Sequence, residues 1–106
     1  MPPKGGNIFI CMIEVVKVIG SPNTDRPSKI YSSIFGRAAK YYPKEERLKK
    51  IKAVFIEKRI DFDSDWCNSY NITTVPTTLF FKDNKLVKKV DGLMATIHIF
   101  EILETL

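Results

Sequence analysis

The sequence is poor in the residues that carry most catalytic chemistry. Its 106 residues include two cysteines and one histidine. Cys11 and Cys67 are too few for a disulfide scaffold and do not form a C-x-x-C pair, so we interpret both as reduced thiols of an intracellular protein. His98 lies in the apolar stretch IHIFEIL, where a packed or partly exposed helix position is favoured over a catalytic one. A cysteine nucleophile would have this single candidate base.

Long apolar runs and ligand-binding motifs are missing too. No run of about 18 apolar residues is present, so we expect no membrane span. Glu14 and Lys17 interrupt the apolar stretch near the N-terminus, and we expect no secretory signal. Zinc spacing, a glycine-rich phosphate loop and an RNA-binding aromatic motif are absent as well. We therefore expect no cofactor, no metal, no membrane partner and a cytoplasmic location, with a nuclear one left open.

Positive charge exceeds negative charge. Seventeen lysines and arginines against twelve aspartates and glutamates give a formal net charge of +5. A basic domain can bind RNA or an acidic partner. The basic residues are spread out, with one dense stretch at residues 40–59. A solvated helix face explains this stretch most simply, and an acidic partner is the functional alternative. Nucleic acid is the less favoured partner.

The overall composition is that of a globular domain. Hydrophobic residues make up 44% of the chain and charged residues 27%, close to the average for folded proteins. A chain of this length can form one hydrophobic core. We expect a single domain over residues 1–106, with residues 1–6 flexible.

The first half of the chain predicts a strand, a loop and a helix. Residues 7–19 are rich in β-branched side chains and predict a strand, with a break near Glu14. Residues 20–27 predict a loop, and Thr24 or Asp25 can cap a helix over residues 28–42. Pro27 suits the first turn of that helix. The side chains expected to face the core are Ile30, Ile34, Phe35, Ala38 and Tyr41.

The second half predicts a strand, a short helix, a hairpin and a final helix. The strand covers residues 51–60, and the short helix covers residues 64–70 after caps at Asp61, Asp63 or Ser64. Strands at 77–82 and 86–90 join through Asp83–Asn84, since both residue types tolerate positive φ. In the last helix Thr96 is a candidate cap, and the inward positions are Ile97, Phe100, Leu103 and Leu106. The element order predicts a parallel β-α-β unit and a mixed sheet with helices on both faces.

From Asp61 onward the sequence resembles the thioredoxin family. The resemblance rests on the order of Asp61, Tyr70-Asn71-Ile72, Val75-Pro76-Thr77, Leu79-Phe80-Phe81-Lys82, Asp83-Asn84, Gly92 and a final amphipathic helix. It implies an α/β fold, thioredoxin-like and three-layered (α/β/α), with a central mixed β-sheet and a C-terminal β-hairpin plus helix. A weaker similarity to the spliceosomal thioredoxin-like proteins covers Tyr70 to Lys85.

The resemblance also implies that the redox centre of the family is lost. Thioredoxins carry Trp-Cys-Gly-Pro-Cys-Lys where a strand meets the long helix, and the best match here is Thr24-Asp25-Arg26-Pro27-Ser28-Lys29. Asp25 and Ser28 stand in place of the two cysteines. Ile19, six positions before Asp25, replaces a buried carboxylate that moves protons in the family. Trp66-Cys67 lies only nine positions before Pro76, too late in the chain for the redox loop, and we interpret it as a coincidence.

A redox-inactive, protein-binding or scaffold module is the function we favour. The resemblance implies a cis Pro76 and a groove for a protein or extended peptide, formed by Asp25, Arg26, Pro27, Ser28, Val75, Pro76, Gly92 and Leu93. Dithiol exchange is not expected, because it needs an attacking and a resolving thiol.

Three alternatives stay open. One is a monothiol oxidoreductase that uses Cys67 or Cys11. In that case Asp61, Asp63 and Asp65 would raise the pKa of Cys67 by repulsion, and the helix N-terminus would lower it. The second is a basic RNA-associated module like the spliceosomal proteins. The third is a thioredoxin-like chain whose first half is altered without a new function.

Overall fold

The computed structural model describes residues 11–21 and 23–106. The elements in chain order are β1 (Cys11–Ile19), α1 (Arg26–Tyr41), two 3-10 turns (Tyr42–Lys44 and Glu46–Leu48), β2 (Ile51–Arg59), α2 (Ser64–Ser69), β3 (Thr77–Lys82), β4 (Lys85–Asp91) and α3 (Thr96–Thr105). The expected start of the first strand at residue 7 and the expected flexible segment 1–6 lie outside the described residues. The expected break near Glu14 is wrong, because β1 runs through it without interruption.

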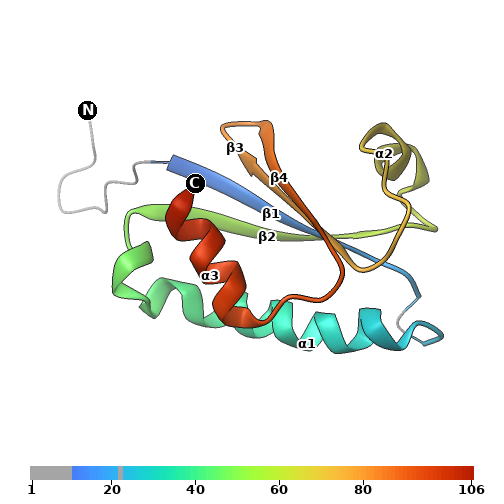
Figure 1. Cartoon of the computed structure of the whole chain (residues 1–106), viewed down its shortest axis with the longest axis horizontal. Coiled ribbons are helices and arrows are strands. Elements are labelled where there is room, and N and C mark those ends of the chain that lie inside the picture. Colours follow the sequence, from blue (N-terminus) through green and yellow to red (C-terminus); the bar gives the residue numbers. More distant parts are fainter. Residues whose placement is uncertain (1–10, 22) are drawn as a thin grey trace.

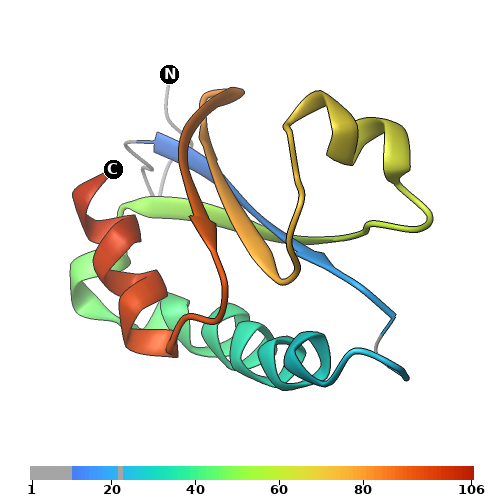
Figure 2. The ribbon, with the colours of Figure 1, turned by 45° about the vertical axis from the view of Figure 1, so that its right-hand side comes forward.

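The sheet has four strands in the order β2-β1-β3-β4. β1 is parallel to β2 and antiparallel to β3, and β4 is antiparallel to β3. Helices α1 and α3 cover one face of the sheet, and α2 lies over the other (Figure 1). The turned view keeps the same arrangement of layers (Figure 2). The predicted three-layer α/β/α fold with a mixed sheet is confirmed.

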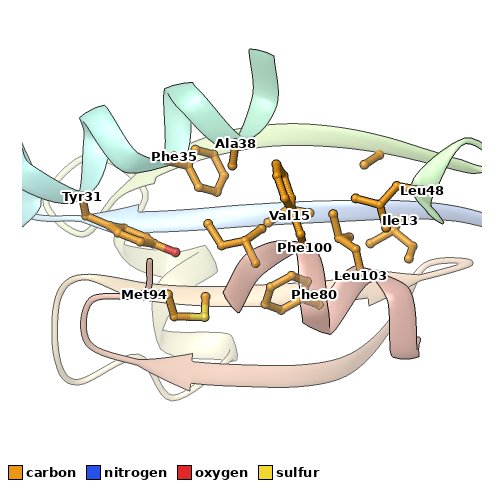
Figure 3. Packing of buried hydrophobic residues seen from close by; sticks show 12 residues of the cluster. Ile13, Val15, Tyr31, Phe35, Ala38, Leu48, Phe80, Met94, Phe100 and Leu103 are labelled. Atoms are coloured by element: carbon orange, nitrogen blue, oxygen red, sulfur yellow. The ribbon is translucent and has the colours of Figure 1, made fainter. Parts of the chain in front are cut away.

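The larger core lies between the sheet and the helix pair α1 and α3. Figure 3 shows side chains from both helices meeting those of β1 and β3. The buried members of this core include Ile13, Val15, Tyr31, Phe35, Phe80, Phe100 and Leu103. Alternation along β1 explains the two cores, because Ile13 and Val15 point to this side while Val16 and Val18 point to α2.

Two predicted core positions are wrong by one or two residues. In α1 the buried stripe runs through Tyr31, Phe35 and Ala38, and Ile30 is 46% exposed. The Tyr31 hydroxyl is satisfied by the Thr78 hydroxyl at 2.6 Å, which permits its complete burial. Ile97 is likewise half exposed, while Ile99 is fully buried.

Tyr41 was also predicted to face the core, but it is 41% exposed at the end of α1. Lys40 and Lys44 lie over its ring, with each ammonium nitrogen 5.3–5.4 Å from the ring centre. The helix therefore turns its last ring toward water and toward two cations instead of toward the sheet.

The predicted caps and turns are largely confirmed. Asp25 is the N-cap of α1, and Asp83 and Asn84 adopt positive φ values of 52° and 68° in the hairpin turn. Thr96 is not a cap, because α3 begins after Ala95. Its hydroxyl donates instead to the carbonyl of Ile34 at 3.5 Å and so joins α3 to α1.

Candidate functional site

The first part of the site is the junction between β1 and α1. The Asp25 carboxylate caps the helix, since one oxygen accepts from the amide of Ser28 at 3.4 Å. The Ser28 hydroxyl donates to the other oxygen at 2.9 Å and accepts from the amide of Gly20 at 2.9 Å. Ser28 is fully buried. These bonds connect the end of β1 to the start of α1, and they use the Ser28 hydroxyl both as a donor and as an acceptor.

The second part is the loop before β3, which meets this junction at Gly20. A Cβ atom on Gly20 would lie 2.7 Å from the Asp25 carboxylate and 3.4 Å from the Val75 side chain. The Val75–Pro76 peptide bond is cis, and the buried Pro76 accepts from the amide of Gly92 at 2.8 Å. The structure thus brings Asp25, Val75, Pro76 and Gly92, which are far apart in the sequence, to one end of the sheet.

The remaining predicted site residues lie around this centre. Arg26 and Pro27 are exposed on the first turn of α1, and Leu93, which follows Gly92, is 49% exposed. Val75 is half-buried. A shallow hollow of about 470 Å³ borders the start of the helix and is lined by Asn23, Thr24, Arg26 and Lys29. The rim of the site is therefore polar and positive, whereas its centre combines the Asp25 carboxylate with the apolar side chains of Val75 and Pro76.

The chemistry available at this junction is limited. Asp25 and Ser28 carry no sulfur, and the serine hydroxyl has no imidazole among its hydrogen-bond partners. His98 is exposed on α3. No group of three or more histidine, cysteine, aspartate or glutamate side chains within residues 11–21 and 23–106 could hold a metal ion. At the junction itself, the side chains of Asp25 and Ser28 serve to cap α1.

Cys67 lies away from this junction, in α2. It is 1% exposed and packs among Val16, Ile72, Leu79 and other residues of the smaller core. Burial raises the pKa of its thiol, Asp63 raises it further, and Lys58 lowers it. Burial is therefore the larger cause of the raised pKa of Cys67. The repulsion expected from Asp61, Asp63 and Asp65 is the smaller cause, and it comes from Asp63.

Cys11, the other monothiol candidate, begins β1, and its side chain lies outside the described residues. At Cys67, the raised pKa and the burial of the thiol both lower its reactivity.

The basic stretch 40–59 runs from the end of α1 through β2, and much of its charge is balanced inside the molecule. Arg47 pairs with Glu104 at 3.0 Å and Arg59 with Asp61 at 2.8 Å. Lys49 and Lys58 also have carboxylates within 4.0 Å. Because these ion pairs offset part of the charge, the stretch presents less positive charge at the surface than its count of lysines and arginines indicates.

No family model matches the sequence. Solved structures with a similar fold are thioredoxins. Thioredoxin-2 of a malaria parasite superimposes with a TM-score of 0.72 at 12% identity, covering 100% of both chains. The germline-specific thioredoxin Deadhead of Drosophila melanogaster gives 0.72 at 18% identity, covering 90% of this chain and 81% of that one. Oxidised thioredoxin of Plasmodium falciparum gives 0.67 at 22% identity, covering 88% and 79%.

The chain has the thioredoxin fold. The predicted resemblance is thus confirmed for the architecture, which the Val75-Pro76-Thr77 and hairpin motifs had indicated. Within the residues that the structure describes, the thioredoxin fold contains no helix with the length and apolarity of a membrane span.

Sequence reasoning missed Gly20, the residue at which the two halves of the site meet in this thioredoxin fold. The signal was present, since a glycine directly after a β-branched strand permits close approach of other chain segments. It also missed Thr77, whose hydroxyl donates to the Thr74 carbonyl at 2.8 Å and has a carboxylate oxygen of Asp91 as a second acceptor at 3.2 Å. This bond holds the loop that carries Val75.

Proposed function

We propose that this thioredoxin-fold chain is a redox-inactive module that binds an extended peptide segment of another protein. One observation carries the proposal. The resemblance matches Asp25 and Ser28 with the two family cysteines, and in this chain they form a buried cap in which the Ser28 hydroxyl bonds Asp25 and Gly20. A hydroxyl engaged in this way cannot attack or resolve a disulfide, because that reaction needs thiolate chemistry.

The loop beside the cap supports peptide binding. Among the described residues, neither the amide nor the carbonyl of Val75 has a hydrogen-bond partner. An unpaired backbone donor and acceptor beside apolar side chains can pair with an extended strand. Leu93 offers an exposed apolar contact next to Gly92, which bonds Pro76. Binding would then combine backbone pairing at Val75 with apolar contact at Leu93.

Selection from a random peptide library displayed on phage tests the binding. Peptides enriched on the wild-type protein are synthesised, and their affinities are measured by calorimetry. We expect Leu93→Asp to weaken them about tenfold, the loss that follows from removing one good apolar contact. Val87→Asp is the matched control, because Val87 is 47% exposed and lies in β4, away from the groove. Failure to enrich any peptide, or equal affinities for the two variants, would overturn the proposed groove.

Insulin reduction by dithiothreitol tests the redox part separately. We expect the wild-type protein to give the rate of the blank. A faster rate that disappears in Cys67→Ala would establish the monothiol alternative instead.

A further inference from the structure

A second hollow lies on the opposite face of the sheet, beside α2. Its volume is about 290 Å³. Its floor is apolar, three aromatic rings line it, and three polar side chains border it; the lining residues are Val16, Ile56, Trp66, Tyr70, Phe81, Glu14, Lys58 and Asn84. They come from β1, β2, α2, β3 and the hairpin turn, apart from Tyr70, which directly follows α2. None of them belongs to the groove proposed above.

The three rings form a connected aromatic cluster. The ring centres of Trp66 and Tyr70 are 4.7 Å apart, and those of Tyr70 and Phe81 are 5.3 Å apart with the edge of one toward the face of the other. Trp66 and Tyr70 are only half-buried, because α2 has six residues and covers a small part of this face. Aromatic faces are therefore accessible within the hollow, where a flat or cationic group could stack.

The two charged side chains that line the hollow, Lys58 and Glu14, differ in whether a group of opposite charge lies nearby. The ammonium of Lys58 lies 4.0 Å from a carboxylate oxygen of Asp63 and 5.5 Å from the centre of the Trp66 ring. Glu14 forms no ion pair within the described residues. It stands in β1, paired in register with Val54 on one side and Phe81 on the other, so apolar groups flank it. The uncompensated charge of the hollow is therefore negative, in a protein of net charge +5.

We propose that this hollow binds the guanidinium group of an arginine side chain from a partner protein. A guanidinium is planar, stacks on aromatic faces and donates two parallel hydrogen bonds to a carboxylate. The rings supply the faces, Glu14 supplies the carboxylate, and the Asn84 side-chain oxygen supplies a further acceptor at the rim. An ammonium would stack less well, and an anion would be repelled by Glu14. The net positive charge opposes this only weakly, because charges beyond about 8 Å are screened at physiological salt.

Trp66 gives a direct readout, because it is the single tryptophan of the chain. The probes are N-acetylarginine amide and N-acetylcitrulline amide, which have nearly the same shape but differ in charge. We expect the arginine probe to change the Trp66 emission with saturation in the millimolar range and the citrulline probe to leave it unchanged. Equal responses to both probes, or no saturable response to arginine, would overturn the proposal. This comparison requires no variant.

A pair of variants tests whether the Glu14 carboxylate is the group that binds the arginine probe. Glu14→Gln should weaken the arginine probe about tenfold, the cost of one charge-assisted contact of about 1.4 kcal/mol. Glu101→Gln makes the same change in net charge on the exposed side of α3, across the sheet, and should leave the affinity unchanged. Equal weakening by both variants would show a long-range charge effect and no site. Leu93→Asp should have no effect here, so failure of either proposal leaves the other intact.

Discussion

At the scale of single residues, Ser28 illustrates how a small polar side chain can be wholly buried at no cost. Its hydroxyl accepts from the Gly20 amide and donates to the Asp25 carboxylate, so no polar atom of the group is left unpaired. A hydroxyl with its capacities used inside the protein contributes to stability by about 1 kcal/mol per bond. The position therefore has a sufficient structural explanation without any chemistry.

Cys67 should make the stability of the protein depend on pH. Burial, and then Asp63, raise the pKa of its thiol above the ordinary value of 9.0. Just above that pH the unfolded chain has released the proton while the folded protein keeps it. The free energy of unfolding is therefore complete below pH 9.0 and falls as the pH rises through the folded pKa. Urea unfolding of wild type and of Cys67→Ala at successive pH values measures this.

The variant should lose stability at every pH, because a buried side chain is truncated, but its decline just above pH 9.0 should be shallower. Tyr31, whose pKa burial raises above 10.0, remains in both proteins and adds a decline of the same sign at higher pH. Parallel curves for the two proteins would contradict the raised pKa of Cys67.

At the scale of elements, replacing Gly36 and Gly20 by alanine should change the free energy of unfolding in opposite directions. Gly36 lies within α1 with nothing within 4 Å of an added Cβ. Gly36→Ala should raise the free energy of unfolding by about 1 kcal/mol, because glycine is the poorer helix former. Gly20→Ala should lower it, since its Cβ would lie 2.7 Å from the Asp25 carboxylate and displace the cap of the same helix.

Urea unfolding of the two variants measures both effects. If Gly20→Ala is as stable as wild type, then the junction of β1 and α1 is looser than the hydrogen bonds of Ser28 indicate. The Gly36 variant gives the effect of an added Cβ inside α1 at a position where it meets no other atom within 4 Å.

Elements with strong local signals could be predicted from the sequence. Asp83–Asn84 places a hairpin because few residues accept two positive φ values in succession. Asp25 and Pro27 place the start of α1 for equally local reasons. The buried face of α1 could not be predicted as well. Ile30 and Tyr31 are both apolar enough, and only Thr78, a distant residue that bonds the tyrosine hydroxyl, decides between them.

The two candidate sites differ in the same way, because one has a local sequence signal and the other depends on residues that are distant in the sequence. The groove residues were predicted because the Val75-Pro76-Thr77 motif is local and specific in its order. The aromatic hollow could not be predicted, because Glu14, Trp66 and Asn84 share no motif and meet only when β1, α2 and the hairpin turn come together. In the sequence Trp66 stands beside Cys67 and resembles part of a redox motif, whereas in the structure its ring packs with Tyr70 and Phe81.

At the scale of the whole molecule, the two proposed sites lie at different places on one sheet. The groove is formed where β1 ends and β3 begins, and the hollow lies beside α2. Figure 1 labels these elements. A partner with an extended segment and an arginine could engage both. Tethering two weak contacts raises the overall affinity without any new contact, provided that the linker spans the sites.

The proposed function predicts that two cysteines at the matched positions give the chain dithiol chemistry. The double variant Asp25→Cys/Ser28→Cys places two thiols three residues apart at the N-terminus of α1, where the helix dipole lowers the pKa of the first one. We expect these thiols to form an intramolecular disulfide on oxidation, detected by mass and by loss of alkylation. We also expect insulin reduction above the wild-type rate.

The matched control is Ser33→Cys/Gly36→Cys, with the same spacing on exposed positions in the middle of α1. There the helix continues on both sides, no amides are free at a terminus, and the thiols do not face the Val75–Pro76 loop. This control should show no gain in insulin reduction. If the two double variants reduce insulin equally while both remain folded, position within the fold does not create the redox centre. The match of Asp25 and Ser28 with the family cysteines would then be wrong, and the proposed loss of redox function would lose its basis.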